Sequence, residues 1–87
     1  MFFIILAVEG QLLKAHKIVL SLSSPYFKSM FSANPCQHPI IFLKDTQFKL
    51  VQHLLDFIYL GKTNVNHDDL QAFMEIAESL QIKGLST

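Results

Sequence analysis

The segment Gly10–Phe31, which reads GQLLKAHKIVLSLSSPYFKSMF, decides the fold because it leads from a strand into two helices through a sharp corner. Ser24 can cap the second helix, and Pro25 suits a first turn, where a backbone N–H has no intrahelical partner. The apolar side chains that follow fall at i, i+3 and i+4, at Phe27, Met30 and Phe31. The pattern predicts one helix over His16–Ser23 and a second that begins at the Ser24-Pro25 corner.

The chain before this segment predicts a β-hairpin. Phe2–Val8 is a continuous run of aromatic, β-branched and other apolar residues, and we expect a turn at Gly10-Gln11 and a second strand over Leu12–Ala15. The apolar run lacks a basic start and a small-residue cleavage site, and it is far shorter than the roughly 20 residues that span a bilayer. It therefore predicts a buried strand and neither a signal sequence nor a membrane segment.

The chain after this segment predicts a small sheet with a cluster of packed helices, in the α+β class. The expected elements are a loop over Ala33–Pro39, a strand over Ile40–Leu43, a long helix capped by Asp45-Thr46 and ended by Gly61, an edge strand over Lys62–Val65, and a last helix that starts at Asp68-Asp69. Periodicity assigns the core to Val19, Leu20, Phe27, Phe31, Val51, Leu54, Leu55, Ile58, Phe73, Ala77 and Leu80.

Length and composition predict one domain over residues 1–87 that binds other proteins. A chain of this size buries only about 60–65% of the surface that its unfolded form exposes. Nevertheless, 51% of its residues are hydrophobic and its mean hydropathy is +0.34. Part of the apolar surface must therefore stay exposed, and a large exposed apolar patch marks a partner site.

Charge and cysteine content argue against several other classes. Seven lysines and no arginine balance seven acidic residues, and the lysines form no basic stripe, so direct nucleic-acid binding is not expected. Cys36 is the only cysteine, which excludes an internal disulfide and is typical of a reducing compartment. Cys36 and His38, with His16, His53 and His67, lack the spacing of a metal site. With three glycines and no nucleophile elbow, we expect no enzyme and no cofactor.

Several segments, in the same order along the chain, resemble BTB/POZ domains. Ala15–Leu20 is similar to the A-H-[KR]-x-V-L signature of that family, and Ser24–Phe27 to the S-x-x-F that follows it. Phe57–Gly61 is similar to F-x-Y-x-G, and Ala77–Leu85 to A-x-x-L-Q-I-x-G-L. The loop Asn34–Ile40 resembles the tramtrack/broad-complex group of arthropod transcription regulators.

The resemblance implies a non-enzymatic module that associates with itself or with other BTB chains and recruits transcriptional co-regulators in the nucleus, without direct contact to nucleic acid or membrane. The residues that this reading assigns to interaction are Phe2, Ile4, Leu6, Lys17, Tyr26, Asn34, Cys36, Gln37 and His38. The family carries an acid that pairs with the base of A-H-[KR]. Phe3 stands at the acid's position and Lys17 at the base's.

Two alternative functions stay open at this point. One is an adaptor that docks on a cullin, which in the family commonly carries an apolar-x-Glu signature after S-x-x-F, whereas the loop here reads SANPCQHP. The other is a chain with weak or no self-assembly, because the family's N-terminal helix and swapped strand do not precede Met1 in this sequence. In that case Phe2–Val8 would be an aggregation-prone strand at an exposed edge. Lys17 also has a plainer interpretation, an exposed helix lysine whose stem covers apolar surface.

Overall fold

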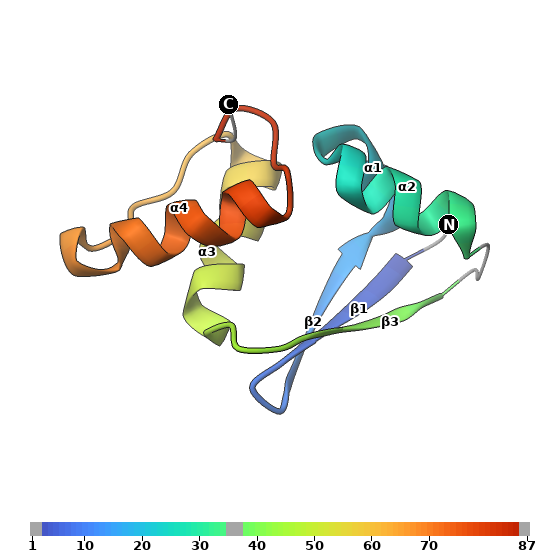
Figure 1. Ribbon diagram of the computed structural model, residues 1–87, viewed down its shortest axis with the longest axis horizontal. Helices are drawn as coiled ribbons and strands as arrows, with labels where there is room; N and C mark the ends of the chain where they lie inside the picture. The colour runs from blue at the N-terminus through green and yellow to red at the C-terminus, as the bar shows by residue number, and fades with distance from the viewer. Residues whose placement is uncertain (1–2, 35–37, 86–87) are drawn as a thin grey trace.

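The computed structural model describes residues 3–34 and 38–85 and places three strands and four α-helices there. Figure 1 shows the helices gathered on one side of a small sheet, α1 and α2 at one end and α3 and α4 at the other. The elements are β1 (Phe3–Val8), β2 (Gln11–His16), α1 (Lys17–Ser23), α2 (Pro25–Ala33), β3 (Ile40–Leu43), α3 (Phe48–Leu60), a 3-10 turn (His67–Asp69) and α4 (Leu70–Ser79). The predicted α+β class is confirmed.

β1 is the central strand of the sheet, whose order is β2–β1–β3. It pairs antiparallel with β2 and parallel with β3. The hairpin turn lies at Glu9-Gly10, where both residues have positive φ (49° and 74°), and not at Gly10-Gln11 as predicted. Positive φ at both central residues gives the turn that matches strand twist. The expectation of β1 as an exposed edge is wrong, because both of its edges are paired.

Alternate residues of β1 form the floor of the core. Ile4, Leu6 and Val8 are buried, whereas the residues between them are only half-buried. This alternation follows from the period of two along a strand. It corrects the prediction that Ile4 and Leu6 belong to an interaction surface, because neither side chain reaches solvent.

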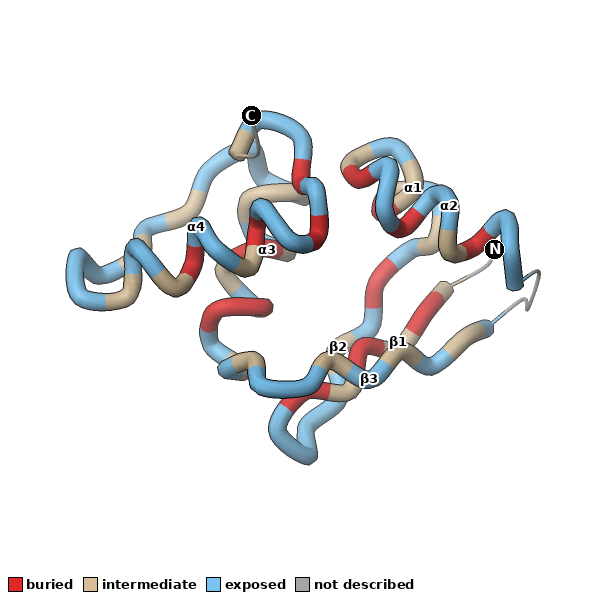
Figure 2. The backbone as a smooth tube through the Cα atoms, in the orientation of Figure 1, coloured by how far each residue is buried: buried red, intermediate tan, exposed pale blue. Residues whose placement is uncertain are grey.

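Most of the predicted core is buried. The buried members are Leu20, Phe27, Phe31, Val51, Leu54, Phe73, Ala77 and Leu80. Leu55 and Ile58 are half-buried and pack against this cluster. Val19 is half-buried rather than buried, which corrects its assignment to the core. Figure 2 shows that the buried positions are spread over the central strand and the four helices.

The Ser24 side chain joins the two ends of the helical layer. Its hydroxyl accepts a hydrogen bond from the Phe27 N–H (3.1 Å), which caps α2, and donates one to the Leu80 carbonyl (2.5 Å) at the end of α4. The Lys83 N–H adds a bond to the Ser23 carbonyl (2.9 Å). Ser24 is the only buried polar residue in the described part of the chain. One fully buried hydroxyl therefore pairs with a backbone N–H at the start of α2 and with a backbone carbonyl at the end of α4. Groups at these helix ends lack a partner within the helix itself.

The start of α3 differs from the prediction, whereas its end is as predicted. The helix begins after Gln47, and neither Asp45 nor Thr46 caps it. Instead, Glu9 in the hairpin turn accepts a hydrogen bond from the Phe48 N–H through Oε1 (2.6 Å), which places a negative charge at the helix N-terminus. Gly61 ends the helix in the left-handed conformation (φ 80°), as expected.

The predicted edge strand over Lys62–Val65 is wrong. This segment is extended but pairs with no strand among the described residues. Its Thr63 hydroxyl lies 2.9 Å from Nδ1 of His53 on α3, and Val65 packs against the core. The segment runs along α3 and leads to Asp68 and Asp69, which start the last helical region as predicted.

Replacing Ser24 by Ala should lower the free energy of unfolding by about 2–4 kcal/mol. The change removes a helix cap and leaves the buried Leu80 carbonyl without its donor. Urea unfolding followed by circular dichroism measures the difference. Ser29→Ala, at an exposed position of the same helix, is the matched control and should stay within about 0.5 kcal/mol of the parent chain. Equal stability of the two variants would show that the Ser24 hydroxyl bonds contribute nothing net.

Candidate interaction surfaces

Helix α1 turns large apolar side chains to solvent. Ile18 (66% exposed) and Leu22 (68%) lie four residues apart and therefore on one face of the helix, while Leu20 points into the core. Tyr26, in the first turn of α2, is 39% exposed. Ile18, Leu22 and Tyr26 are called the α1 surface below.

Two of the predicted interaction residues flank this corner. Lys17, at the start of α1, is half-buried, and its ammonium lies 5.4 Å from the centre of the Phe31 ring. Its ammonium thus lies near an aromatic ring, and the half-buried position differs from the exposed lysine of the plainer interpretation. Tyr26 packs edge-on against Phe27 at 5.6 Å and leaves part of its ring and its hydroxyl accessible.

The predicted contact loop is described only at its two ends. Asn34 is exposed and ends α2, with its backbone N–H bonded to the Met30 carbonyl (3.1 Å). His38 is exposed, and its ring lies 4.3 Å from that of Phe3. The predictions for Phe2, Cys36 and Gln37 fall outside the described residues.

Phe3 lies among basic side chains. The Lys14 ammonium is 4.1 Å from the centre of the Phe3 ring, a cation–π contact, and the His38 ring packs near the same side chain. Phe3, Lys14, Ala15 and His16 line a cavity of about 390 Å³ at this end of the sheet. An aromatic ring therefore occupies the position where the resemblance places the family's acid, and Lys14 contacts it.

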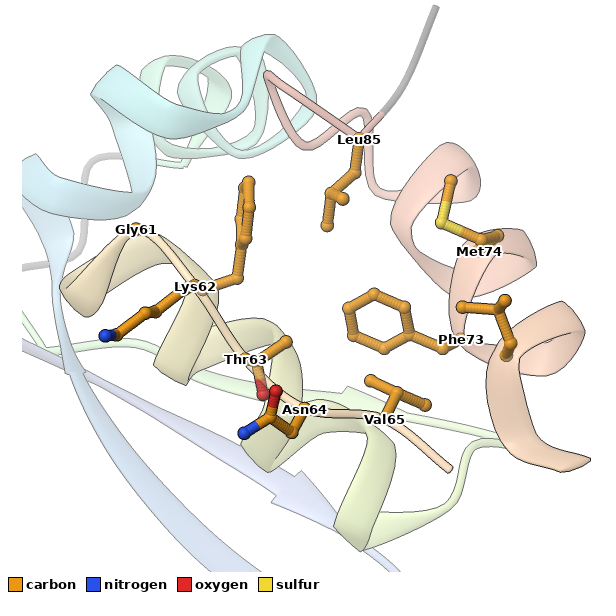
Figure 3. Close-up of a pocket in the computed structure, with 10 residues that line it drawn as sticks. Gly61, Lys62, Thr63, Asn64, Val65, Phe73, Met74 and Leu85 are labelled. Atoms are coloured by element: carbon orange, nitrogen blue, oxygen red, sulfur yellow. The ribbon is translucent and has the colours of Figure 1, made fainter. Parts of the chain in front are cut away.

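A second, apolar cavity of about 490 Å³ lies between α3, the 61–65 segment and α4. Figure 3 shows Phe73 and Leu85 directed into it and Lys62 directed away. Gly84, which has φ 92°, precedes Leu85, and a Cβ at this glycine would lie 3.3 Å from the Phe57 ring. Most of its walls are apolar, and Lys62, Thr63 and Asn64 line one side, so this recess can hold an apolar side chain but offers no acid–base pair for catalysis.

His16 and Tyr59 connect the sheet to α3. The His16 N–H donates to the Tyr59 hydroxyl oxygen (2.8 Å), and Nδ1 of His16 lies 3.0 Å from the same atom. His16 stands at the N-cap position of α1, but its side chain makes no hydrogen bond to that helix. The contact is structural, because both atoms of His16 are used to hold α3 against the end of β2.

The described residues show no other type of site. No three of their His, Cys, Asp or Glu side chains gather closely enough to hold a metal ion. None of their helices has the length and apolar content needed to cross a bilayer. The geometry therefore directs attention to surfaces that contact proteins.

Sequence reasoning missed the most exposed apolar residues. Ile18 and Leu22 lie within the predicted helix at helical spacing, and that spacing cannot say which face of α1 meets the core. Ile40 and Phe42 of β3 were read only as members of an apolar strand, although both are exposed. Alternation along β3 could have indicated one open face, had its partner strand been known.

The chain belongs to the BTB/POZ family, a class of protein-interaction module whose members associate with themselves and with other proteins. The family model for the BTB/POZ domain matches residues 3–87. Two solved BTB domains have the same fold: that of human gigaxonin (TM-score 0.81, 26% identity, covering 93% of this chain and 68% of that one) and that of zebrafish PATZ1 (0.80, 29%, 94% and 66%).

Within the family, the chain is similar to proteins of the tramtrack group, as the Asn34–Ile40 loop indicated. It is 54% identical over 81 residues to the alpha isoform of protein tramtrack of Drosophila melanogaster, and 51% identical to the longitudinals lacking protein-like of the same organism. These matches cover 93% of this chain, but 10% and 64% of the two relatives. The chain thus corresponds to one part of each of these proteins.

Replacing Tyr59 by Phe should lower the free energy of unfolding by about 1 kcal/mol, because the His16 N–H and ring lose their common partner. Thermal unfolding by calorimetry measures the change. Tyr26→Phe is the matched control, since Tyr26 is similarly exposed (39% against 43%) and its hydroxyl bonds no described residue. If both variants unfold at the parent temperature, water replaces the Tyr59 hydroxyl without cost.

Proposed function

We propose that this domain brings copies of itself, or other BTB chains, together and thereby recruits transcriptional co-regulators in the nucleus. The observation that carries the proposal is the α1 surface. Three large apolar side chains stay exposed on a corner that buried hydrogen bonds hold in place. Exposed apolar side chains in one place are typical of a partner site.

The rigidity of the corner supports this choice over other exposed residues. Ser24 caps α2 and bonds to the end of α4, so that Ile18 and Leu22 on α1 are presented on a fixed frame. A surface that is already ordered loses little conformational entropy when a partner binds. A second copy offers the same apolar surface, which is the requirement for a two-fold symmetric contact.

Association of this kind explains how a domain without a DNA-binding face acts in transcription. The chain has a net charge of zero, and its lysines are spread over several elements. Other parts of a longer protein would contact DNA, and joining two such proteins raises the effective concentration of the second binding event. The role in transcription and the nuclear location rest on the likeness to the tramtrack group.

Replacing Leu22 by Asp should weaken self-association at least about tenfold, because a carboxylate would be buried in an apolar contact. The molar mass from light scattering, measured over a wide concentration range, gives the dissociation constant. Leu60→Asp is the matched control: Leu60 on α3 is equally exposed (70% against 68%) and lies outside the α1 surface. This control should assemble like the parent chain.

Two results would contradict the proposal. A parent chain that stays a folded monomer at all concentrations would support the alternative of weak or no self-assembly. An oligomer that Leu22→Asp leaves intact but Leu60→Asp disrupts would place the contact on α3 instead.

A further inference from the structure

β2 lies at one edge of the three-stranded sheet, so one of its two sides pairs with no other strand (Figure 1). On β1, the Ile5 N–H donates to the Pro39 carbonyl (3.0 Å), just before β3, so the backbone groups of Ile5 point away from β2. Lys14, which lies opposite Ile5, therefore forms a non-hydrogen-bonded pair with it, and Leu12, two residues earlier, does the same with Ala7. The backbone N–H and C=O groups of Leu12 and Lys14 consequently point outward from the sheet.

His16 supports this orientation from the other end of β2. It lies two residues after Lys14, so its N–H points in the same direction, and there it donates to the Tyr59 hydroxyl (2.8 Å). The outward backbone groups of Leu12 and Lys14, in contrast, bond to no described residue, and both residues are exposed. These outward groups are called the β2 edge below. An unpaired row of strand N–H and C=O groups is what an added strand requires.

Helix α3 runs alongside β2 and is fastened to both of its ends. Glu9, just before β2, accepts a hydrogen bond from the Phe48 N–H at the start of α3 (2.6 Å). At the other end, His16 bonds to Tyr59 in the last turn of α3. The space beside β2 therefore has a helix along one side.

A cavity of about 280 Å³ lies between Leu13 of β2 and α3. Gln52 and Asp56, which line it on the helix side, are exposed, so the cavity opens to solvent. Side chains that lie opposite each other on neighbouring strands share a face of the sheet. The side chain of an added strand that lies opposite Leu13 would therefore enter this cavity.

The cavity carries one unpaired negative charge. Lys49, also on its wall, forms an ion pair with Asp69 (3.2 Å), whereas Asp56 forms no ion pair with any other described residue. A basic side chain is the group that complements a single carboxylate at the wall of a cavity.

We propose that the β2 edge binds an extended segment of a partner protein as an added antiparallel strand, with a basic side chain of that segment in the cavity beside Asp56. In this arrangement, two residues of the segment exchange N–H and C=O bonds with Leu12 and Lys14. Strand addition takes its affinity from such main-chain bonds and its specificity from pockets for alternate side chains. None of these residues belongs to the α1 surface.

The cavity favours such a segment over the β2 strand of a second copy. In a second copy, α3 lies beside β2 through the same contacts, and antiparallel pairing of two β2 edges would bring both α3 helices to one side of the joined sheet. A helix is about 10 Å across, whereas the cavity of about 280 Å³ has room for side chains only.

The test is a titration of the ¹⁵N-labelled domain, followed by NMR, with capped peptides of sequence Thr-Val-Lys-Val-Thr and Thr-Val-Glu-Val-Thr. The central residue lies opposite Leu13, and the two valines lie opposite Leu12 and Lys14. We expect saturable shifts and slower hydrogen exchange at the amides of Leu12 and Lys14. The Lys peptide should bind roughly two- to fivefold more tightly than the Glu peptide, because its charge complements Asp56.

Backbone methylation of the Lys peptide distinguishes strand addition from side-chain binding alone. N-methylation of both valines removes the N–H groups that face the β2 edge and should weaken binding at least about tenfold. N-methylation of the central lysine is the matched control. Its N–H points away from β2, so binding should stay within about twofold of the unmodified peptide.

Two pairs of variants locate the site on the domain. Leu12→Pro removes an outward N–H without breaking a bond of the sheet and should weaken binding at least about tenfold, whereas Leu12→Ala keeps the N–H and should bind the peptide. Asp56→Lys should make the Glu peptide the tighter ligand, and Glu78→Lys, at an exposed position of α4, should not. Thermal unfolding of each variant checks that the fold is kept, and the methylated peptides test the proposal on the parent chain.

Several outcomes would overturn the proposal. These are an absence of saturable shifts at millimolar peptide, shifts that spare Leu12 and Lys14, and equal effects of the two kinds of methylation. A lower molar mass of Leu12→Pro than of Leu12→Ala in light scattering would show that a second copy occupies the β2 edge. Leu22→Asp should bind the Lys peptide like the parent chain, which separates this proposal from the proposed self-association.

Discussion

The hydrogen bonds of the Ser24 hydroxyl determine how the rest of the domain is arranged. The hydroxyl caps α2 and satisfies the Leu80 carbonyl, so it connects the α1–α2 corner to the end of α4 across 56 residues of chain. Without it, a backbone carbonyl would remain buried and unpaired, at a cost of about 1–3 kcal/mol. In a domain this small, whose total stability is on the order of 5–10 kcal/mol, that is a large share.

The parts of the fold that local rules control could be predicted from the sequence. Ser24-Pro25 begins α2 and Gly61 ends α3 because capping and positive φ depend on neighbouring residues alone. The start of α3 could not be predicted in the same way. Asp45 and Thr46 have the right chemistry, but the acceptor comes from Glu9, 39 residues away, once the hairpin brings its turn next to the helix.

The surfaces were harder to predict than the core, for a related reason. Ile4 and Leu6 have the composition of a contact strand, yet they lie on the face of β1 that packs against the helices and are buried there. The register of β3 with β1 sets Ile40 and Phe42 on the opposite side of the sheet. Which face of an apolar strand meets the core depends on its register with its partner, and register is a property of the assembled sheet.

The small size of the domain and its apolar composition explain why large apolar side chains remain exposed on more than one of its sides. One layer of helices can cover one face of a three-stranded sheet, and these helices cannot bury every apolar side chain that they carry themselves. Ile18 and Leu22 therefore remain on the helical side, and Phe42 on the opposite side of the sheet. The inner residues of β1 lie between these two sets of exposed side chains, so the two sets are on opposite sides of the domain.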